Sequence, residues 1–249
     1  MSDSEPCEML PWDSTFFGRR IARVHGDVLT PDLCRKSDHW VERHRVDLIY
    51  FLARPDDLQT TELAEQSGYQ LVDVRITLER ALDSQVKSET NHVATIRPAT
   101  AADRDPLIAL ARQSHRGTRF YFDSRIPRDK ADELYAAWMA RDLGGDVLVA
   151  EREGQIVGYV TFSYDPQQMV GSIGLTAVAA SQRGVGIGRA LMESAVRVLG
   201  DRGAARVTVV TQGRNIAAQR LYGRCGFIVH NLQLYYHRWF TADGASARC

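Results

Sequence analysis

The sequence has no net charge and no long apolar run, and these two absences exclude several classes of protein. Its 249 residues include 31 Lys and Arg and 31 Asp and Glu. The chain therefore lacks the basic field with which proteins bind nucleic acid or a membrane surface. No stretch approaches the roughly 20 consecutive apolar residues that a membrane-spanning helix needs. We expect neither nucleic acid nor a membrane as a partner.

Cysteine is scarce, and its spacing argues against a zinc site or a disulfide framework. Four cysteines are scattered along the chain without a CxxC motif, at Cys7, Cys34, Cys225 and Cys249. The first ten residues, MSDSEPCEML, lack the basic segment and apolar run of a secretory signal. We expect a cytoplasmic protein that holds no metal.

A polar stretch without periodicity, DSQVKSETN, divides the chain into two parts of unequal length. We predict an N-terminal α/β unit at 1–82, a linker at 83–92, a larger unit at 93–240 and a frayed tail at 241–249. Hydrophobic patterns in the first unit predict strands and helices in alternation, at 20–26, 31–44, 47–54, 56–68 and 70–80. The second unit alternates similarly, except that residues 116–127 are rich in aromatics and arginines and have no clear period. The fold class is therefore α/β.

Three glycines in five positions follow a predicted strand in the second unit. The stretch SQRGVGIGRA places Gly184, Gly186 and Gly188 before a predicted helix. Glycines let successive N–H groups point at one anion, and the first amides of the helix add further donors. We predict that this loop binds a phosphate or pyrophosphate, with charge added by Arg183 and Arg189. A tight turn without a ligand is the alternative.

Spacing excludes two common phosphate loops. A Walker loop ends in Gly-Lys-Ser/Thr, which does not occur here, and a dinucleotide fingerprint needs glycine where Arg189 stands. In the next predicted helix, Asn215 and Tyr222 are seven residues apart, which places both on one face. Taken singly, Asn215 is an N-cap and Tyr222 a packed aromatic.

Together, the motifs LTAV, QRGVGIGRALM, the helix from Asn215 to Tyr222 and the following CGF resemble the GCN5-related N-acetyltransferases, the GNAT family. The resemblance covers the whole second unit. It implies an α/β (α+β) GNAT fold with a central mixed, mostly antiparallel sheet, to which the smaller N-terminal unit is added. It also implies an enzyme that uses acetyl-CoA as acyl donor and acetylates an amine directly.

The resemblance also implies roles for the matching residues. Tyr222 takes the position of the general acid that protonates the CoA thiolate. The positions along acetyl-CoA are Thr176, Ala177 and Val178 on the strand, Arg183, Gly184, Val185, Gly186, Ile187, Gly188 and Arg189 in the loop, and Asn215 on the helix.

Three further stretches resemble the TDP-fucosamine acetyltransferases, which acetylate the amino group of dTDP-4-amino-4,6-dideoxygalactose. They are LPWDSTFFG, TRFYFDSRIP and the C-terminal LYYHRWF. Arginines in the middle stretch suit a pyrophosphate, and its aromatics suit a base or sugar, although each aromatic alone is more simply explained as core packing. The predicted acceptor-binding residues are His115, Arg119, Phe120, Tyr121, Asp123 and Arg125, with Arg116 and Phe122 beside them; His115 and Asp123 are also candidates to take the amine proton.

The N-terminal unit has no glycine loop. Its EQSGYQLV and the later GRCGFIVH both read as helix end, glycine, aromatic and strand. This echo fits a degenerate half-GNAT unit, and it equally fits any glycine-capped helix before a strand. Aligning the glycines puts Asp57 and Ala64 opposite Asn215 and Tyr222. We expect this unit to support the acceptor side or a homodimer interface.

Two alternatives stay open on function. One is an enzyme that acts on another small amine or on a protein N-terminus, although the neutral chain disfavours a polyamine. The other, from a different class, is a non-catalytic acyl-CoA sensor.

Overall fold

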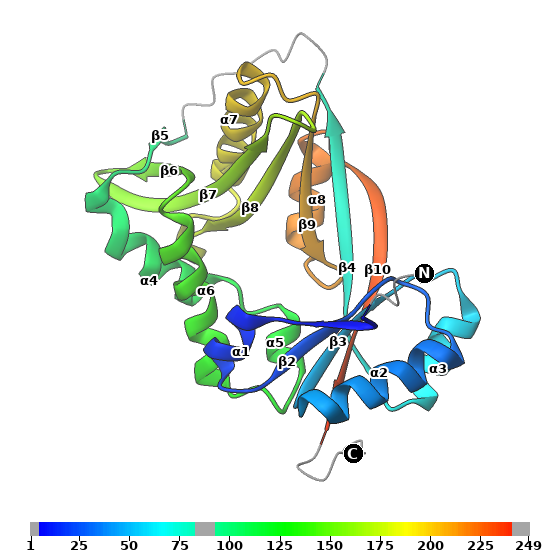
Figure 1. Ribbon diagram of the computed structural model, residues 1–249. Coiled ribbons are helices and arrows are strands. Elements are labelled where there is room, and N and C mark those ends of the chain that lie inside the picture. Colours follow the sequence, from blue (N-terminus) through cyan, green and yellow to red (C-terminus); the bar gives the residue numbers. More distant parts are fainter. Residues whose placement is uncertain (1–4, 83–92, 241–249) are drawn as a thin grey trace. The chain divides into compact units, whose positions relative to one another are not determined.

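The computed structural model describes residues 5–82 and 93–240, so the predicted linker and tail lie outside the described residues. The fold is mixed α/β with a mostly antiparallel sheet, as the sequence predicts (Figure 1). Among the described residues, no helix has the length and apolarity to span a membrane.

The chain divides into two compact units. One contains the residues up to Arg75 together with those from Leu232 onward, and the other is Ile76–Asn231. We predicted a single boundary near residue 83, whereas the chain passes between the units twice. The reason is that β4 (Gln70–Ala81) and β10 (Ile228–Trp239) are 12-residue strands, each with residues in both units.

The first unit is a small sheet with connecting helices. Strand β2 lies parallel to β3, as a helical crossover requires. Strand β1 pairs antiparallel with β2, and β10 pairs antiparallel with β3. Apart from parts of β4 and β10, its elements are β1 (Cys7–Met9), α1 (Pro11–Phe17), β2 (Ile21–Val24), α2 (Pro31–His44), β3 (Leu48–Ala53) and α3 (Leu58–Gln66).

Local chemistry explains where these helices start. The Thr30 hydroxyl accepts the Leu33 N–H at 3.1 Å and caps α2, and the Asp57 carboxylate caps α3 by accepting the Thr60 N–H at 2.7 Å. The strand, helix, strand, helix, strand order from residue 20 onward matches the prediction. Sequence analysis assigned no element to β1 and α1, because elements of three and seven residues contain too little periodicity to detect.

The second unit has five strands in the order β9-β8-β7-β6-β5, beside the end of β4. All neighbouring pairs are antiparallel except β8 with β9. Its elements are β5 (Thr95–Pro98), α4 (Arg104–Ser114), α5 (Arg119–Phe122), α6 (Arg128–Asp142), β6 (Asp146–Arg152), β7 (Gln155–Asp165), β8 (Val170–Val178), α7 (Ile187–Asp201), β9 (Arg206–Gln212) and α8 (Ile216–Arg224).

Helices cover both faces of this sheet. A Cβ on Gly158 would lie 3.0 Å from the Leu191 side chain of α7, so that face of β7 packs closely on α7. The next residue, Tyr159, points the other way, into a buried cluster with Leu107 of α4 and Met139 of α6. The short helix α5 occupies the stretch for which the sequence showed no period.

A β-bulge interrupts the pairing of β7 with β8. Two residues of β8, Gly174 and Leu175, lie opposite the single residue Thr161 of β7. The Thr161 hydroxyl accepts the Leu175 N–H at 2.9 Å and donates to the Asp142 carboxylate at 3.2 Å. A Cβ on Gly174 would lie only 2.4 Å from that hydroxyl oxygen. The bulge thus depends on a hydroxyl, a carboxylate and the absence of a side chain.

We expect Gly174→Ala to lower the free energy of unfolding by about 1–3 kcal/mol, because the new methyl group collides with Thr161. A matched control is Gly223→Ala on α8, where a Cβ meets nothing within 4 Å. Urea unfolding measures both. Equal midpoints for Gly174→Ala and the wild-type chain would contradict the account of the bulge.

Candidate active site

The parallel pairing of β8 with β9 ends before either strand does. It runs from Val170↔Arg206 to Ile173↔Val209, just before the bulge. Beyond that point β8 stays paired with β7 but has no register partner on β9 among the described residues. The two strands therefore separate toward their C-terminal ends. The predicted residues Thr176, Ala177 and Val178 all lie on the separated part of β8.

The glycine loop leads from this end of β8 into α7. Gly184 and Gly186 have φ of +83° and +96°, which residues with a Cβ rarely adopt. Gly186 is the N-cap of α7 and supplies no side-chain cap to the first amides of the helix. Gly188 serves packing, since a Cβ there would lie 3.3 Å from Leu221 of α8. The free amides at the start of the 15-residue helix α7 thus follow directly on the two glycines, an arrangement that suits an anion.

The two arginines of the loop have different partners. The Arg183 side chain donates from Nε to the Val178 carbonyl at 3.0 Å, so it braces the loop against the end of β8. Arg189 forms an ion pair of 2.6 Å with Glu193, one turn along α7. Because Glu193 offsets its charge, Arg189 contributes less positive field to the loop than we expected.

Helix α8 holds the second predicted pair. The Asn215 side chain accepts the Ala218 N–H at 3.2 Å and is the N-cap, as its sequence position predicts. Two turns later, Tyr222 is buried, with only 5% of its surface exposed.

Tyr222 stays protonated at neutral pH. Burial raises the pKa of its hydroxyl to about 12, while the nearby Thr176 hydroxyl acts in the opposite direction. Tyr222 of α8 therefore lies near Thr176, a residue on the separated part of β8. A neutral phenol in this position is a proton donor and not a base.

His115 is placed differently from our expectation. It follows α4, its ring stacks on Tyr135 at 4.4 Å between centroids, and its Nε2 shares a hydrogen bond of 2.9 Å with the Tyr159 hydroxyl. Burial, and to a lesser degree the charge of Arg183, lower the pKa of His115 to about 4. A histidine with this pKa is neutral but is a weak base, which argues against it as acceptor of the amine proton.

Three other residues of the predicted acceptor stretch are buried or held by hydrogen bonds. Phe120 is fully buried, so it packs into the core and offers no surface to an acceptor. Asp123 is also buried, and its carboxylate accepts the Arg125 N–H at 3.0 Å, which fixes a turn. The Tyr121 hydroxyl donates to Asp132 at 2.6 Å, and burial together with this bond raises its pKa.

One contact joins Phe122, in the predicted acceptor stretch, to an arginine for which we predicted no role. The guanidinium of Arg214, between β9 and α8, lies 3.5 Å from the ring centroid of Phe122, the last residue of α5. Phe122 is nevertheless 57% exposed. The sequence carries no signal for this contact, because its two residues lie far apart in the chain and Arg214 belongs to no predicted motif.

Comparison with known proteins identifies the family. The profile of the Acetyltransferase (GNAT) family matches residues 109–227, which contain the separated strands, the glycine loop and α8. An uncharacterized N-acetyltransferase from Archaeoglobus fulgidus is 36% identical over 134 residues, which make up 51% of this chain and 88% of that protein. The chain belongs to the GNAT family of acetyltransferases.

Two further similarities extend over most of this GNAT chain. The spore coat polysaccharide biosynthesis protein SpsD of Bacillus subtilis is 26% identical over 196 residues, covering 78% of this chain and 67% of SpsD. A GCN5-related N-acetyltransferase from Sphaerobacter thermophilus has the same fold, with a TM-score of 0.66, 20% identity and coverage of 94% and 76% of the two chains. By contrast, the chain spans only 37% of a mycothiol acetyltransferase from Amycolatopsis mediterranei, at 30% identity.

Two other features of this GNAT protein lie outside the proposed chemistry. Cys225 follows α8 in a buried position that raises the pKa of its thiol to about 11, so it is not a nucleophile at neutral pH. In the described part of the chain, no group of three or more His, Cys, Asp or Glu side chains could hold a metal ion.

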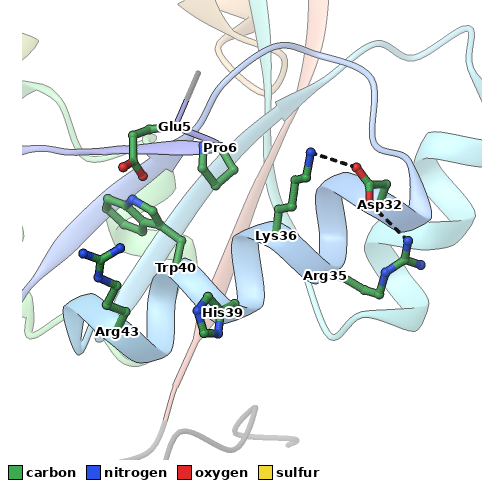
Figure 2. Close-up of a pocket in the computed structure, with 8 residues that line it drawn as sticks. All are labelled: Glu5, Pro6, Asp32, Arg35, Lys36, His39, Trp40 and Arg43. Atoms are coloured by element: carbon green, nitrogen blue, oxygen red, sulfur yellow. Dashed lines mark hydrogen bonds and ion pairs between the residues drawn. The ribbon is translucent and has the colours of Figure 1, made fainter. Parts of the chain in front are cut away.

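Two pockets in the described structure contain none of the predicted site residues. One, of about 380 Å³, lies in the first unit over α2, where Asp32 forms ion pairs with Arg35 and Lys36 (Figure 2). Its lining is Glu5, Pro6, Asp32, Arg35, Lys36, His39, Trp40 and Arg43. The other, of about 480 Å³, lies in the second unit between the loop before α4 and the start of β6.

The pKa of His115 generates a prediction for stability against pH. Its folded-state pKa lies below the ordinary value of 6.5, so the unfolded chain binds more protons between pH 6.5 and 4. Stability should therefore fall as the pH falls through this window, by roughly 2 kcal/mol from this group.

Replacing His115 with Gln should flatten that dependence. Urea unfolding at pH 6.5 and 4.5 measures it, and the comparison is of slopes, because the replacement also changes stability at neutral pH. The control is His230→Gln, at an exposed position on β10. An unchanged slope in His115→Gln would show that His115 is not held neutral.

Proposed function

We propose that this GNAT protein transfers the acetyl group of acetyl-CoA to the amino group of a nucleotide-linked amino sugar. The observation that carries the donor half is the separation of β8 from β9 between a glycine loop and a buried tyrosine. Acetyltransferases of this family use acetyl-CoA, and each part of this opening suits one part of that molecule.

The pyrophosphate of acetyl-CoA binds at the loop. Gly184, Gly186 and the first amides of α7 supply N–H donors, and the positive end of the helix favours the charge. The pantetheine arm pairs with the β9-facing edge of β8 at Thr176 and Ala177, taking the place that β9 leaves. Asn215, at the start of α8, lies along the arm on its other side.

The reaction needs no nucleophile from the enzyme. The acceptor amine attacks the thioester carbonyl, an N–C bond forms and the C–S bond breaks. A backbone N–H of β8 stabilises the developing oxyanion, an effect typically worth about 3 kcal/mol. Tyr222 donates its proton to the departing thiolate, and the amine proton leaves to water, since His115 is a weak base and the Asp123 carboxylate is buried in a turn.

Two observations support a nucleotide-sugar acceptor. SpsD, which covers 78% of this chain, is named for polysaccharide biosynthesis. In addition, the guanidinium of Arg214, which follows β9, lies over the exposed ring of Phe122, the last residue of α5. A different small amine, or a protein N-terminus, is the second candidate, and the mycothiol acetyltransferases, which match 44% of this chain, favour a small molecule over a protein.

We propose that the first unit descends from a second GNAT half that lost its donor site. Helices α3 and α8 both have nine residues, both have side-chain N-caps, and both are followed by a glycine with φ near +80°. Asp57 occupies the N-cap position of Asn215, whereas the fully buried Ala64 stands where Tyr222 would be. Because it lacks a phenol and a glycine loop, this unit supports the acceptor side of the site or forms the interface of a homodimer. We place the protein in the cytoplasm.

Tyr222→Phe tests the general acid. We expect kcat to fall about 100-fold or more, because the thiolate loses its proton donor, with little change in KM for acetyl-CoA. Thiol release measures turnover, and the thermal shift caused by acetyl-CoA measures binding. Tyr164→Phe, at a partly exposed tyrosine of β7, is the matched control. Unchanged turnover in Tyr222→Phe would remove Tyr222 from the mechanism.

The acceptor is tested by a panel of amines at fixed acetyl-CoA. We expect thiol release with nucleotide-linked amino sugars and kcat/KM at least about tenfold lower with the free amino sugars, polyamines and an N-terminal peptide. Activity on the simple amines alone would exclude the nucleotide-sugar assignment. If CoA itself causes no thermal shift, the donor assignment fails as well.

A further inference from the structure

Three consecutive aromatic residues of α5 each have an arginine over the ring. Arg119 lies 4.0 Å from the ring centroid of Phe120, and Arg128 lies 5.5 Å from that of Tyr121. Arg214 lies 3.5 Å from that of Phe122. Contacts at these distances are favourable cation–π interactions, and the third has the shortest separation.

The three pairs differ in their access to solvent. Phe120 is fully buried, and Tyr121 is tied to Asp132 by its hydroxyl. In the third pair, Phe122 is 57% exposed and Arg214 is also exposed. Only this pair, of the three, presents both its ring and its guanidinium to a molecule that approaches from solvent.

The segment that leads to Phe122 starts beside β7 and ends beside the loop that follows β9. Its first residue is His115, which shares a hydrogen bond of 2.9 Å with the Tyr159 hydroxyl of β7. It ends at Phe122 under Arg214, which follows β9. The Phe122–Arg214 pair therefore stands at the β9 side of the opening, directly before Asn215.

We infer that Arg214, oriented by Phe122, binds the anionic group of the acceptor, a phosphoryl or carboxylate group. Stacking occupies the face of a guanidinium and orients its N–H edge, with which arginine binds phosphate or carboxylate in a bidentate manner. The exposed Phe122 ring offers an apolar surface to the adjoining base or sugar. Arg214 is thus a specificity-determining residue, and this inference rests on the proposed acetyl transfer.

The kinetic test uses two acceptors, an amino sugar and its nucleoside-diphosphate-linked form, of which only the second carries phosphates. In Arg214→Gln, we expect KM for the charged acceptor to rise about 10- to 100-fold. We expect KM for the neutral acceptor and for acetyl-CoA, and kcat for both, to stay within about twofold. Phe122→Leu should act in the same direction with a smaller effect, and Arg214→Lys should lie between wild type and Arg214→Gln.

Arg220→Gln, at an exposed arginine of α8, is the matched control and should leave every parameter unchanged. A rise in KM for acetyl-CoA in Arg214→Gln would mean that Arg214 binds the donor, and equal losses on both acceptors would mean a structural role. Either result overturns the inference. An amine that carries a carboxylate in place of the phosphates distinguishes the two anions.

A binding measurement keeps the inference testable apart from turnover. The protein is saturated with CoA, so that the phosphate positions of the donor are filled, and is titrated with inorganic pyrophosphate by calorimetry. We expect the wild-type chain to bind it and Arg214→Gln to bind at least about tenfold more weakly. Equal binding by the two, or no binding by the wild-type chain, overturns the inference. Failure of acetyl transfer with pyrophosphate binding intact would instead contradict the proposed function.

Discussion

The Thr161 hydroxyl is the group on which the β-bulge beside the proposed donor site depends. It accepts a hydrogen bond from the Leu175 N–H, which in a regular antiparallel ladder would donate to a backbone carbonyl. It also donates a hydrogen bond to the Asp142 carboxylate. This substitution inserts an extra residue in β8, and the parallel pairing with β9 ends immediately before it. A hydroxyl held between an amide and a carboxylate has little freedom to rotate, so these two hydrogen bonds hold the bulge in one geometry. The opening is consequently part of the folded sheet.

The two sides of the proposed active site differ in whether backbone or side chains supply the contacts. On the donor side the contacts come from backbone: glycine amides, the first turn of α7 and the edge of β8. On the proposed acceptor side they come from side chains, above all Arg214 over the exposed Phe122 ring. A backbone site suits a ligand that every relative shares, because it tolerates change in most side chains. A side-chain site suits a ligand that differs between relatives, because single replacements alter it.

The same difference explains how much of the molecule could be predicted from its sequence. The glycine loop, the Asn215 cap and the facing Tyr222 were predictable, since each is a local pattern within one loop or helix. The stacking of Arg214 on Phe122 joins the loop before α8 to the distant helix α5, and local periodicity carries no information about it. Phe120 and Phe122 illustrate the limit: two residues apart on one short helix, one is fully buried and the other exposed. The bulge at Gly174 was equally invisible, because a glycine in a strand has several possible reasons.

The passage of β4 and β10 through both units has a consequence for any shortened form of this protein. The end of β4 belongs to the second unit, where Glu79 pairs with Arg206 at 3.3 Å, Arg80 donates to the Cys225 carbonyl at 2.7 Å and Leu82 donates its N–H to Ala205 at 2.9 Å. A fragment that begins after residue 92 would keep the whole family match and still lose this strand. Its β9 would then become a bare sheet edge, of the kind that recruits other chains into aggregates. The smallest autonomous acetyltransferase in this sequence is therefore larger than the segment by which its family is identified.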